Sequence, residues 1–252
     1  VCIGLAFLIQ WLAFIPAFLG NTEKFYDITG GITYLAIFGL AYYAGGSGDL
    51  RSGLVFVLGA VWAVRLAAFL YTRIHIAGKD DRFDEIKKIG PRFFLTWTLQ
   101  GLWVSFTSAT VLVVISSPSK VAPDVFMWAG LLVWLFGFIF EVAADHQKRV
   151  FRADAANKGT FIRSGLWSVS RHPNYFGEIV LWVGMALIAV PVLQGWQWAA
   201  MLSPVFVTLL LMRVSGVPLL EAKANKLWGG KADYEEYKRN TPVLIPKLGG
   251  KK

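Results

Sequence analysis

The stretch "SRHPNYFGEIVLWVGMALIAV", residues 170–190, sets a group of polar side chains at the mouth of a long apolar run. The polar members are Arg171, His172, Asn174, Tyr175 and Glu178. Polar and charged side chains are costly at the end of a membrane helix, and where they occur they usually mark a functional site. The stretch therefore predicts a membrane span that begins at a binding site.

The composition supports a membrane protein. Of the 252 residues, 56% are hydrophobic and only 16% are charged, whereas a soluble domain carries about a quarter charged residues. The single cysteine, Cys2, excludes an internal disulfide and a metal site built from cysteines.

About seven apolar segments have the length of a transmembrane helix, which is about 20 residues. They lie near 1–19, 29–45 (the weakest), 52–72, 93–115, 123–144 and, for two helices, 177–214. The last segment is broken at Pro191 and at residues 194–198. The chain is predicted to be an all-α bundle of about seven transmembrane helices.

The basic residues give this bundle an orientation. With seven spans, 22 of the 25 Lys and Arg residues fall on one face, in the connections 20–28, 73–92 and 145–176 and in the tail from Arg213 onward. Cytosolic loops carry such an excess. We therefore expect an outer N-terminus and a cytosolic C-terminus, with the long basic connections forming a cytosolic cap of loops and short helices.

The connection 145–176 mixes donors and acceptors. Asp145, Lys148, Arg149 and Arg152 share a face if the preceding helix continues. Lys and Arg alone could meet anionic lipid headgroups, but acids, an amide and a histidine are not needed for that. Arg binds phosphate oxygens with two parallel hydrogen bonds, and Glu or Asn can bond hydroxyl or amide groups. The mixture predicts a pocket for a phosphorylated, nucleotide-like cofactor on the cytosolic face.

Other kinds of site lack support. The segment "GSGDLR", residues 46–51, starts like a dinucleotide-binding turn but ends in Arg51 and joins two helices on the outer face. No P-loop or nucleophile elbow is found. The three histidines lie far apart without metal-binding spacing, so no metal is expected.

Polar residues also occur in or beside the apolar segments: Gln10, Asp27, Arg65, Gln100 and Glu141. Such residues are candidates to line a substrate cavity. The alternative is that they pair with one another between helices, or that Asp27 lies at the interface. Most of the Trp and Tyr side chains are interpreted as an interfacial belt and as packing.

The chain resembles a known family. The segments "GKDDRFDE" (78–85), "FLTWTLQGLWV" (94–104), "ADHQKRVFRADAANKGTFIRSG" (144–165), "GLWSVSRHPNYFGEI" (165–179) and "SGVPLLEAKANKLWGGKADYEEYKRNTPVLIP" (215–246) resemble the steroid 5α-reductase superfamily, in its branch of small membrane proteins. The resemblance implies a seven-helix bundle that binds NADPH on its cytosolic side. It also implies reduction of a carbon–carbon double bond, conjugated to a carbonyl group, in a steroid-, sterol- or polyprenol-like lipid.

The resemblance also assigns residues. It implies that Asp145, Arg149, Arg152, Asn174, Glu178 and Arg213 border NADPH, together with Arg171, His172 and Tyr175 of this branch's motif and Glu221, Tyr234 and Tyr237 of the C-terminal part. The family's Gln-Glu pair, which polarises the substrate carbonyl, is absent. Asp27, Arg65 and Tyr71 are the nearest candidates for that catalytic role. Residues 1–252 are predicted to form one domain, with substrate-side helices in 1–115 and a cofactor-binding half in 116–252.

Two alternatives remain. Membrane methyltransferases of the isoprenylcysteine and phospholipid type, which use S-adenosylmethionine, share a similar "RHP-x-Y-x-G" loop. The basic residues Lys148, Arg149 and Arg152 favour NADPH, because S-adenosylmethionine has no phosphates. The absence of the Gln-Glu pair instead favours a non-catalytic accessory subunit of a membrane complex. The expected partners are a lipid substrate from the bilayer, membrane lipids and a larger membrane complex, with no nucleic acid.

Overall fold

The computed structural model describes residues 1–45, 48–77 and 83–247, without the side chains of 73–77. Residues 46–47 of the segment 46–51 and residues 78–82 of the segment 78–85 lie outside the described part. The described residues divide into two compact units. The first unit comprises Val1–Met127 and Ile188–Ser203, and the second comprises Trp128–Leu187 and Pro204–Lys252.

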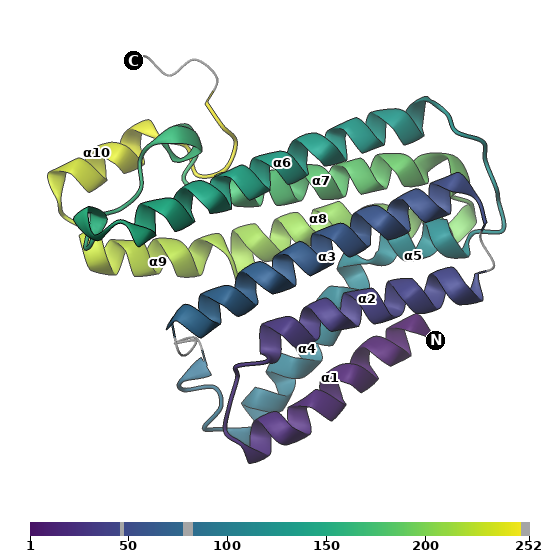
Figure 1. Ribbon diagram of the computed structural model, residues 1–252, viewed down its shortest axis with the longest axis horizontal. Helices are drawn as coiled ribbons and strands as arrows, with labels where there is room; N and C mark the ends of the chain where they lie inside the picture. Colours follow the sequence, from purple (N-terminus) through teal and green to yellow (C-terminus); the bar gives the residue numbers. More distant parts are fainter. Residues whose placement is uncertain (46–47, 78–82, 248–252) are drawn as a thin grey trace. The chain divides into compact units, whose positions relative to one another are not determined.

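The first unit is built from helices that are coloured purple to teal in Figure 1, together with one short green segment late in the chain. They are α1 (Cys2–Leu19), α2 (Tyr26–Ala44), α3 (Leu50–Ala77), α4 (Gly90–Thr107), α5 (Ala109–Ser116) and the short η5 (Gly195–Met201). Helix α2 packs against α1, α3, α4 and α5, so it lies at the centre of the unit. This central place explains its buried small and polar residues, among them Thr29, Gly30, Gly31 and Thr33.

Helices α2 and α3 run antiparallel, and aromatic pairs fix their register. Tyr34 contacts Trp62 with ring centroids 5.0 Å apart, and Tyr42 stacks on Phe56 at 4.9 Å. Further along, a β-carbon on Gly31 would lie 2.4 Å from that of Ala67, so only glycine allows this approach.

The second unit contains most of α6 (Val125–Ala153) and α7 (Pro173–Ala189) and everything after residue 203. Its other elements are η2 (Ala155–Asn157), η3 (Gly165–Ser168), most of α8 (Leu202–Leu209), the π-helix η6 (Leu210–Val214), α9 (Val217–Trp228) and α10 (Ala232–Asn240). A short 3-10 turn, η4 (Val190–Val192), follows α7 and lies in the first unit.

Helices α6 and α7 touch through glycine. A β-carbon on Gly177 would lie 2.6 Å from the backbone nitrogen of Glu141, and one on Gly137 would lie 2.5 Å from that of Leu181. No β-carbon fits at such distances, so the two backbones meet directly, as they do where small residues line membrane helix pairs. The contact brings the start of α7, with its polar loop, against the polar end of α6.

The predicted all-α membrane bundle is confirmed. Five helical segments of the described chain are long and apolar enough to span a membrane: Cys2–Leu19, Leu50–Thr72, Val125–Ala153, Pro173–Val192 and Gly195–Trp228. Helices α4 and α5 would form a sixth span, which is bent by 52° at Ser108, where the sequence predicted one unbroken segment. Helix α2 corresponds to the weakest predicted span, 29–45, and is 19 residues long.

Candidate functional site

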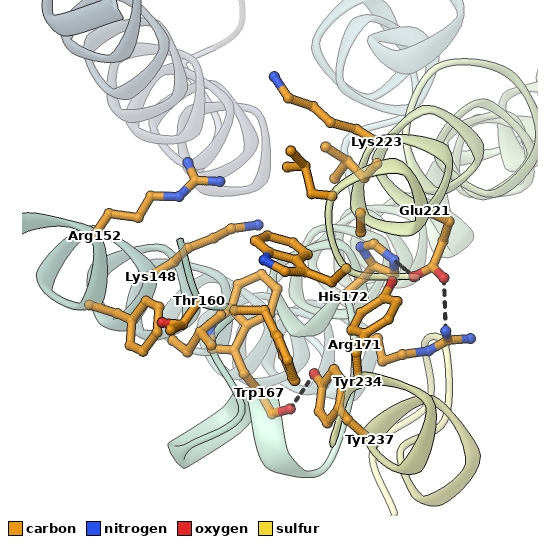
Figure 2. A pocket seen from close by; sticks show the side chains of 17 residues that line it. Lys148, Arg152, Thr160, Trp167, Arg171, His172, Glu221, Lys223, Tyr234 and Tyr237 are labelled. Carbon is orange, nitrogen blue, oxygen red and sulfur yellow. Dashed lines mark hydrogen bonds and ion pairs between the residues drawn. The ribbon is translucent and has the colours of Figure 1, made fainter. Parts of the chain in front are cut away.

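A pocket of about 150 Å³ opens in the second unit between the end of α6, the loop 154–172, α9 and α10. Figure 2 shows its side chains, most of which belong to two groups. The aromatic ones are Phe151, Phe161, Trp167, Trp228, Tyr234 and Tyr237, and the cationic ones are Lys148, Arg152, Arg171 and Lys223. A wall of ring faces with cations around it is suited to a flat ligand that carries negative charge.

Phe161 is the centre of the aromatic wall. Its ring centroid lies 5.7 Å from that of Trp228, 5.1 Å from that of Tyr234 and 5.4 Å from that of Tyr237. The Trp228 indole N–H donates to the carbonyl oxygen of Gly159 at 2.8 Å. These contacts tie α9 and α10 to the loop that precedes η3, so the wall is a single packed structure.

Tyr237 connects α10 to η3. Its hydroxyl group donates to the carbonyl oxygen of Trp167 at 2.6 Å, and the indole N–H of Trp167 donates to the carbonyl oxygen of Ala144 on α6 at 3.0 Å. Burial raises the pKa of both Tyr234 and Tyr237. Both hydroxyl groups therefore stay neutral at physiological pH.

Glu221 joins α9 to the loop before α7. One carboxylate oxygen accepts a hydrogen bond from Arg171 Nη1 at 2.8 Å, and the other lies 2.8 Å from His172 Nε2 (Figure 2). The His172 ring is buried and stacks on Tyr175, with centroids 5.6 Å apart. A carboxylate held by two donors from one loop fixes the position of both side chains.

Burial lowers the pKa of His172, and this effect outweighs the opposing effect of the Glu221 carboxylate. The ring is therefore neutral at pH 7, and Nε2 carries the hydrogen that it donates to Glu221. Its Nδ1 is then an acceptor, buried and without a hydrogen-bond partner among the described residues. The Nε of Arg171 is likewise buried and has no hydrogen-bond partner among the described residues, so two consecutive residues of the loop carry an unpartnered donor and an unpartnered acceptor.

The cations lie around the ring faces. The Lys148 ammonium group is 4.2 Å from the Trp167 ring centroid. Figure 2 shows it directed toward the centre of the pocket, with Arg152 and Lys223 at the edge. An anionic group placed above the wall would therefore meet positive charge from α6 on one side and from α9 on the other.

Half of the predicted cofactor residues line this pocket: Arg152, Arg171, His172, Glu221, Tyr234 and Tyr237. The others lie elsewhere in the second unit. Asp145 is buried on α6, and Asn174, Tyr175 and Glu178 occupy the first turns of α7. Arg149 is exposed, with Nη2 3.1 Å from His146 Nδ1, and Arg213 is exposed on η6. The role of these six residues in binding a cofactor stays a prediction.

Sequence reasoning missed the aromatic wall. Phe161, Trp167 and Trp228 were not among the predicted site residues, because Trp-rich sequences were interpreted as interfacial belt and packing. Lys148 was counted among the basic residues that favour a phosphorylated cofactor but was not assigned to the site, and Lys223 was not considered. The available signal was position, since Phe161 and Trp167 lie inside the same basic connection as Arg152 and Arg171.

The three predicted catalytic residues belong to the first unit. Asp27 lies in the first turn of α2, Arg65 lies on α3 with its guanidinium carbon 5.3 Å from the Phe69 ring centroid, and Tyr71 is 42% exposed on α3. The register that sets Gly31 against Ala67 places Asp27 and Tyr71, each one turn further, at the same level of the helix pair. Their catalytic role stays a prediction.

The buried glutamines connect helices. Gln10 donates from Nε2 to Thr33 Oγ1 at 2.8 Å, and Gln100 donates from Nε2 to the carbonyl oxygen of Tyr26 at 3.2 Å. These bonds join α1 and α4 to α2. They favour the alternative in which such residues pair between helices, a common use of polar side chains in membrane bundles.

Comparison with known proteins places this site in a context. A family model described as "Protein of unknown function (DUF1295)" matches residues 13–241. The 3-oxo-5-alpha-steroid 4-dehydrogenase 1 of Rattus norvegicus is 27% identical over 73% of this chain and 66% of its own. The steroid 5-alpha-reductase DET2 of Gossypium hirsutum is 28% identical over 49% of this chain and 44% of its own. These matches confirm the resemblance to the steroid 5α-reductase superfamily, at low identity.

One further relative comes from another class. The probable O-methyltransferase ustE of Ustilaginoidea virens is 29% identical over 28% of this chain and 25% of its own. The chain thus covers less than two thirds of the length of each of these relatives. No solved structure matches it.

Proposed function

This chain belongs to the DUF1295 family, and from that premise we propose that it is a membrane reductase which uses NADPH. Its substrate is a lipid of steroid, sterol or polyprenol type in which a carbon–carbon double bond is conjugated to a carbonyl group. The single observation that carries the proposal is the pocket of the second unit, where an aromatic wall, four cations and the Glu221 cluster meet. The resemblance to the reductase relatives supports the same activity.

The residues of the pocket fit one end of a dinucleotide. An adenine ring stacks on aromatic faces, and phosphate oxygens take hydrogen bonds from Arg and Lys. The pocket of about 150 Å³ is smaller than the 300–1,000 Å³ of sites that enclose a whole ligand. We therefore assign it to the phosphate-bearing adenosine end. The first turns of α7, with Asn174 and Glu178, are assigned to the remainder of the cofactor.

Each part of the chain then has a chemical task. NADPH, when bound, supplies the hydride. Arg152, Arg171 and Lys148 neutralise phosphate charge, and Glu221 holds Arg171 and His172 in place at 2.8 Å each. In the first unit, Asp27 or Tyr71 donates a hydrogen bond to the substrate carbonyl as negative charge develops there. One well-placed donor can lower such a barrier by about 3–4 kcal/mol.

The experiment is a binding comparison on the purified full chain in detergent. We expect NADPH to raise the melting temperature and expect Arg152→Ala and Arg171→Ala to abolish that rise. Lys158→Ala is the matched control, because Lys158 is an exposed cation of the same connection that does not line the pocket. Equal stabilisation of all variants would exclude this site. Oxidation of NADPH in the presence of a lipid enone then tests the reaction.

A second candidate is a methyltransferase that uses S-adenosylmethionine, and the match to ustE is the observation that favours it. S-adenosylmethionine carries adenine but no phosphate, so it would use the aromatic wall and not the cations. Replacing NADPH by S-adenosylmethionine in the same assay separates the two. If NADPH binds without turnover of any enone, the accessory-subunit alternative is favoured instead.

We also propose that the C-terminus and the pocket face the cytosol and that the N-terminus lies outside, since 22 of the 25 Lys and Arg residues fall on that face. The lipid substrate then enters from the bilayer, and a larger membrane complex is a further proposed partner. The orientation is checked with a Lys158→Cys variant and a thiol reagent that cannot cross the membrane. We expect labelling of Cys at position 158 in permeabilised cells but not in intact cells.

A further inference from the structure

A second hollow lies on the tail that follows α10, and we call it the tail groove. Its cations are Arg171, Lys238, Arg239 and Lys247, and its apolar side chains include Val243 and Ile245. It is wider and more open than the pocket, with a volume of about 510 Å³. No Asp or Glu of the described chain lines it. The groove is therefore a basic hollow with an apolar edge.

The tail is fixed against the loop that begins the span α7. Arg171 N donates to the carbonyl oxygen of Pro242 at 2.9 Å, Ser170 Oγ donates to that of Leu244 at 2.7 Å, and Lys247 N donates to that of Val169 at 3.0 Å. Helix α7 is apolar enough to cross a membrane from Pro173 onward. The groove therefore lies next to the end of a span, where lipid headgroups are found.

Two of the four cations already make an ion pair with a carboxylate. Arg171 pairs with Glu221 at 2.8 Å, and Lys238 pairs with Glu235 at 3.0 Å. Arg239 and Lys247 are exposed, and within the described residues neither makes an ion pair. Beside them, Ile245 is 71% exposed. Two unpaired cations next to an exposed aliphatic side chain, at the end of a span, match the two parts of a lipid at the interface.

We propose that the tail groove binds the phosphate headgroup of an anionic phospholipid, with Arg239 and Lys247 on the phosphate and Ile245 against the acyl chains. The nearby start of α7 adds the positive end of its helix dipole. This inference does not depend on the proposed reductase activity, because it uses neither the aromatic wall nor a cofactor. Its ligand is part of the membrane and not a reactant.

The test measures lipid retention by the full chain in detergent. The probes are phosphatidylglycerol, zwitterionic phosphatidylcholine and inorganic phosphate at equal ionic strength, and bound lipid is counted by native mass spectrometry. We expect phosphatidylglycerol to bind in preference to phosphatidylcholine. The double variant Arg239→Ala with Lys247→Ala should weaken that binding roughly 25-fold, since each basic residue near an anionic surface contributes about fivefold.

The control is the charge-matched double variant Lys226→Ala with Lys231→Ala, because both lysines are exposed and neither lines the groove. It should retain the lipid, and both double variants should melt at the wild-type temperature without lipid. Equal lipid loss in the two double variants would overturn the proposal in favour of general surface charge. Displacement of the lipid by inorganic phosphate alone would overturn it in favour of a site for soluble phosphate.

Discussion

The pocket of the second unit and the helix pair α2–α3 of the first unit both contain predicted site residues, but they hold them differently. In the pocket, Arg171, His172 and Glu221 are joined by two hydrogen bonds of 2.8 Å, although Glu221 is far from the other two in sequence. On the helix pair, Asp27 and Tyr71 share a level that is set by packing at Gly31. The predicted binding residues are thus connected by hydrogen bonds, whereas the predicted catalytic residues are related only by the way in which α2 and α3 pack against each other.

The pocket and the helix pair α2–α3 should therefore respond differently to substitution. A network that holds a loop affects both stability and cofactor binding, because its members also join α9 to that loop. A residue on a helix face that is placed by register can change without unfolding anything.

The largest effect on stability is expected at the close contact between α6 and α7, which supports the pocket. Gly177→Ala places a β-carbon 2.6 Å from the backbone of Glu141, and neither backbone can yield without separating α6 from α7. We expect a loss of stability of about 3 kcal/mol, measured by thermal unfolding in detergent. Gly39→Ala on α2 is the control, because nothing lies within 4 Å of its new β-carbon. Similar melting temperatures for the two variants would contradict the close helix contact.

Glu221→Gln is expected to be next in size. It keeps the shape of the side chain but removes the charge that holds Arg171 and His172, and a hydrogen bond to a charged group contributes about 1.5–3 kcal/mol. NADPH binding should weaken by roughly tenfold or more. Asp27→Asn should leave NADPH binding unchanged and lower only the turnover of a lipid enone. Equal losses of binding in both variants would remove the distinction between the two regions.

The parts of the fold and of the pocket that could be predicted from sequence are those with a local signal in the chain. Apolar runs of span length are local signals, and the helices agree with them. The polar cluster around "RHPNYFGE" is also a local signal, and Arg171 and His172 from it line the pocket, whereas Asn174, Tyr175 and Glu178 do not.

The complete aromatic wall could not be predicted, because Trp228 meets Phe161 only when α9 folds back on the loop 154–172. Only the place of Phe161 and Trp167 within the basic connection is a local signal. The bend at Ser108 was not predicted, although the polar residues Thr107, Ser108 and Thr110 mark its position within the segment 93–115.

A smaller effect separates the tyrosines of the two regions. Tyr237→Phe removes a buried hydrogen bond of 2.6 Å to the carbonyl oxygen of Trp167, so we expect a loss of about 1 kcal/mol in unfolding free energy. Tyr71 is 42% exposed, and Tyr71→Phe should leave stability unchanged while it reduces turnover if Tyr71 donates to the substrate. Denaturant unfolding of the two variants measures the change in stability, and NADPH oxidation in the presence of a lipid enone measures the change in turnover. A stable Tyr237→Phe protein would show that the wall does not need this bond.

The last predicted effect is a dependence on pH that arises from His172. Burial lowers its pKa below the ordinary value of 6.5, and the nearby charges of Lys148 and Arg171 act in the same direction. Below pH 6.5 the unfolded chain takes up a proton that the folded ring resists, so stability should fall as the pH drops through that range, by at most about 1.4 kcal/mol per pH unit. Above pH 6.5 the effect should vanish. His172→Gln keeps a donor for Glu221 but cannot titrate. Melting temperatures from about pH 5 to about pH 8 should therefore show a shallower acid decline for this variant, and parallel curves would assign the decline to other groups.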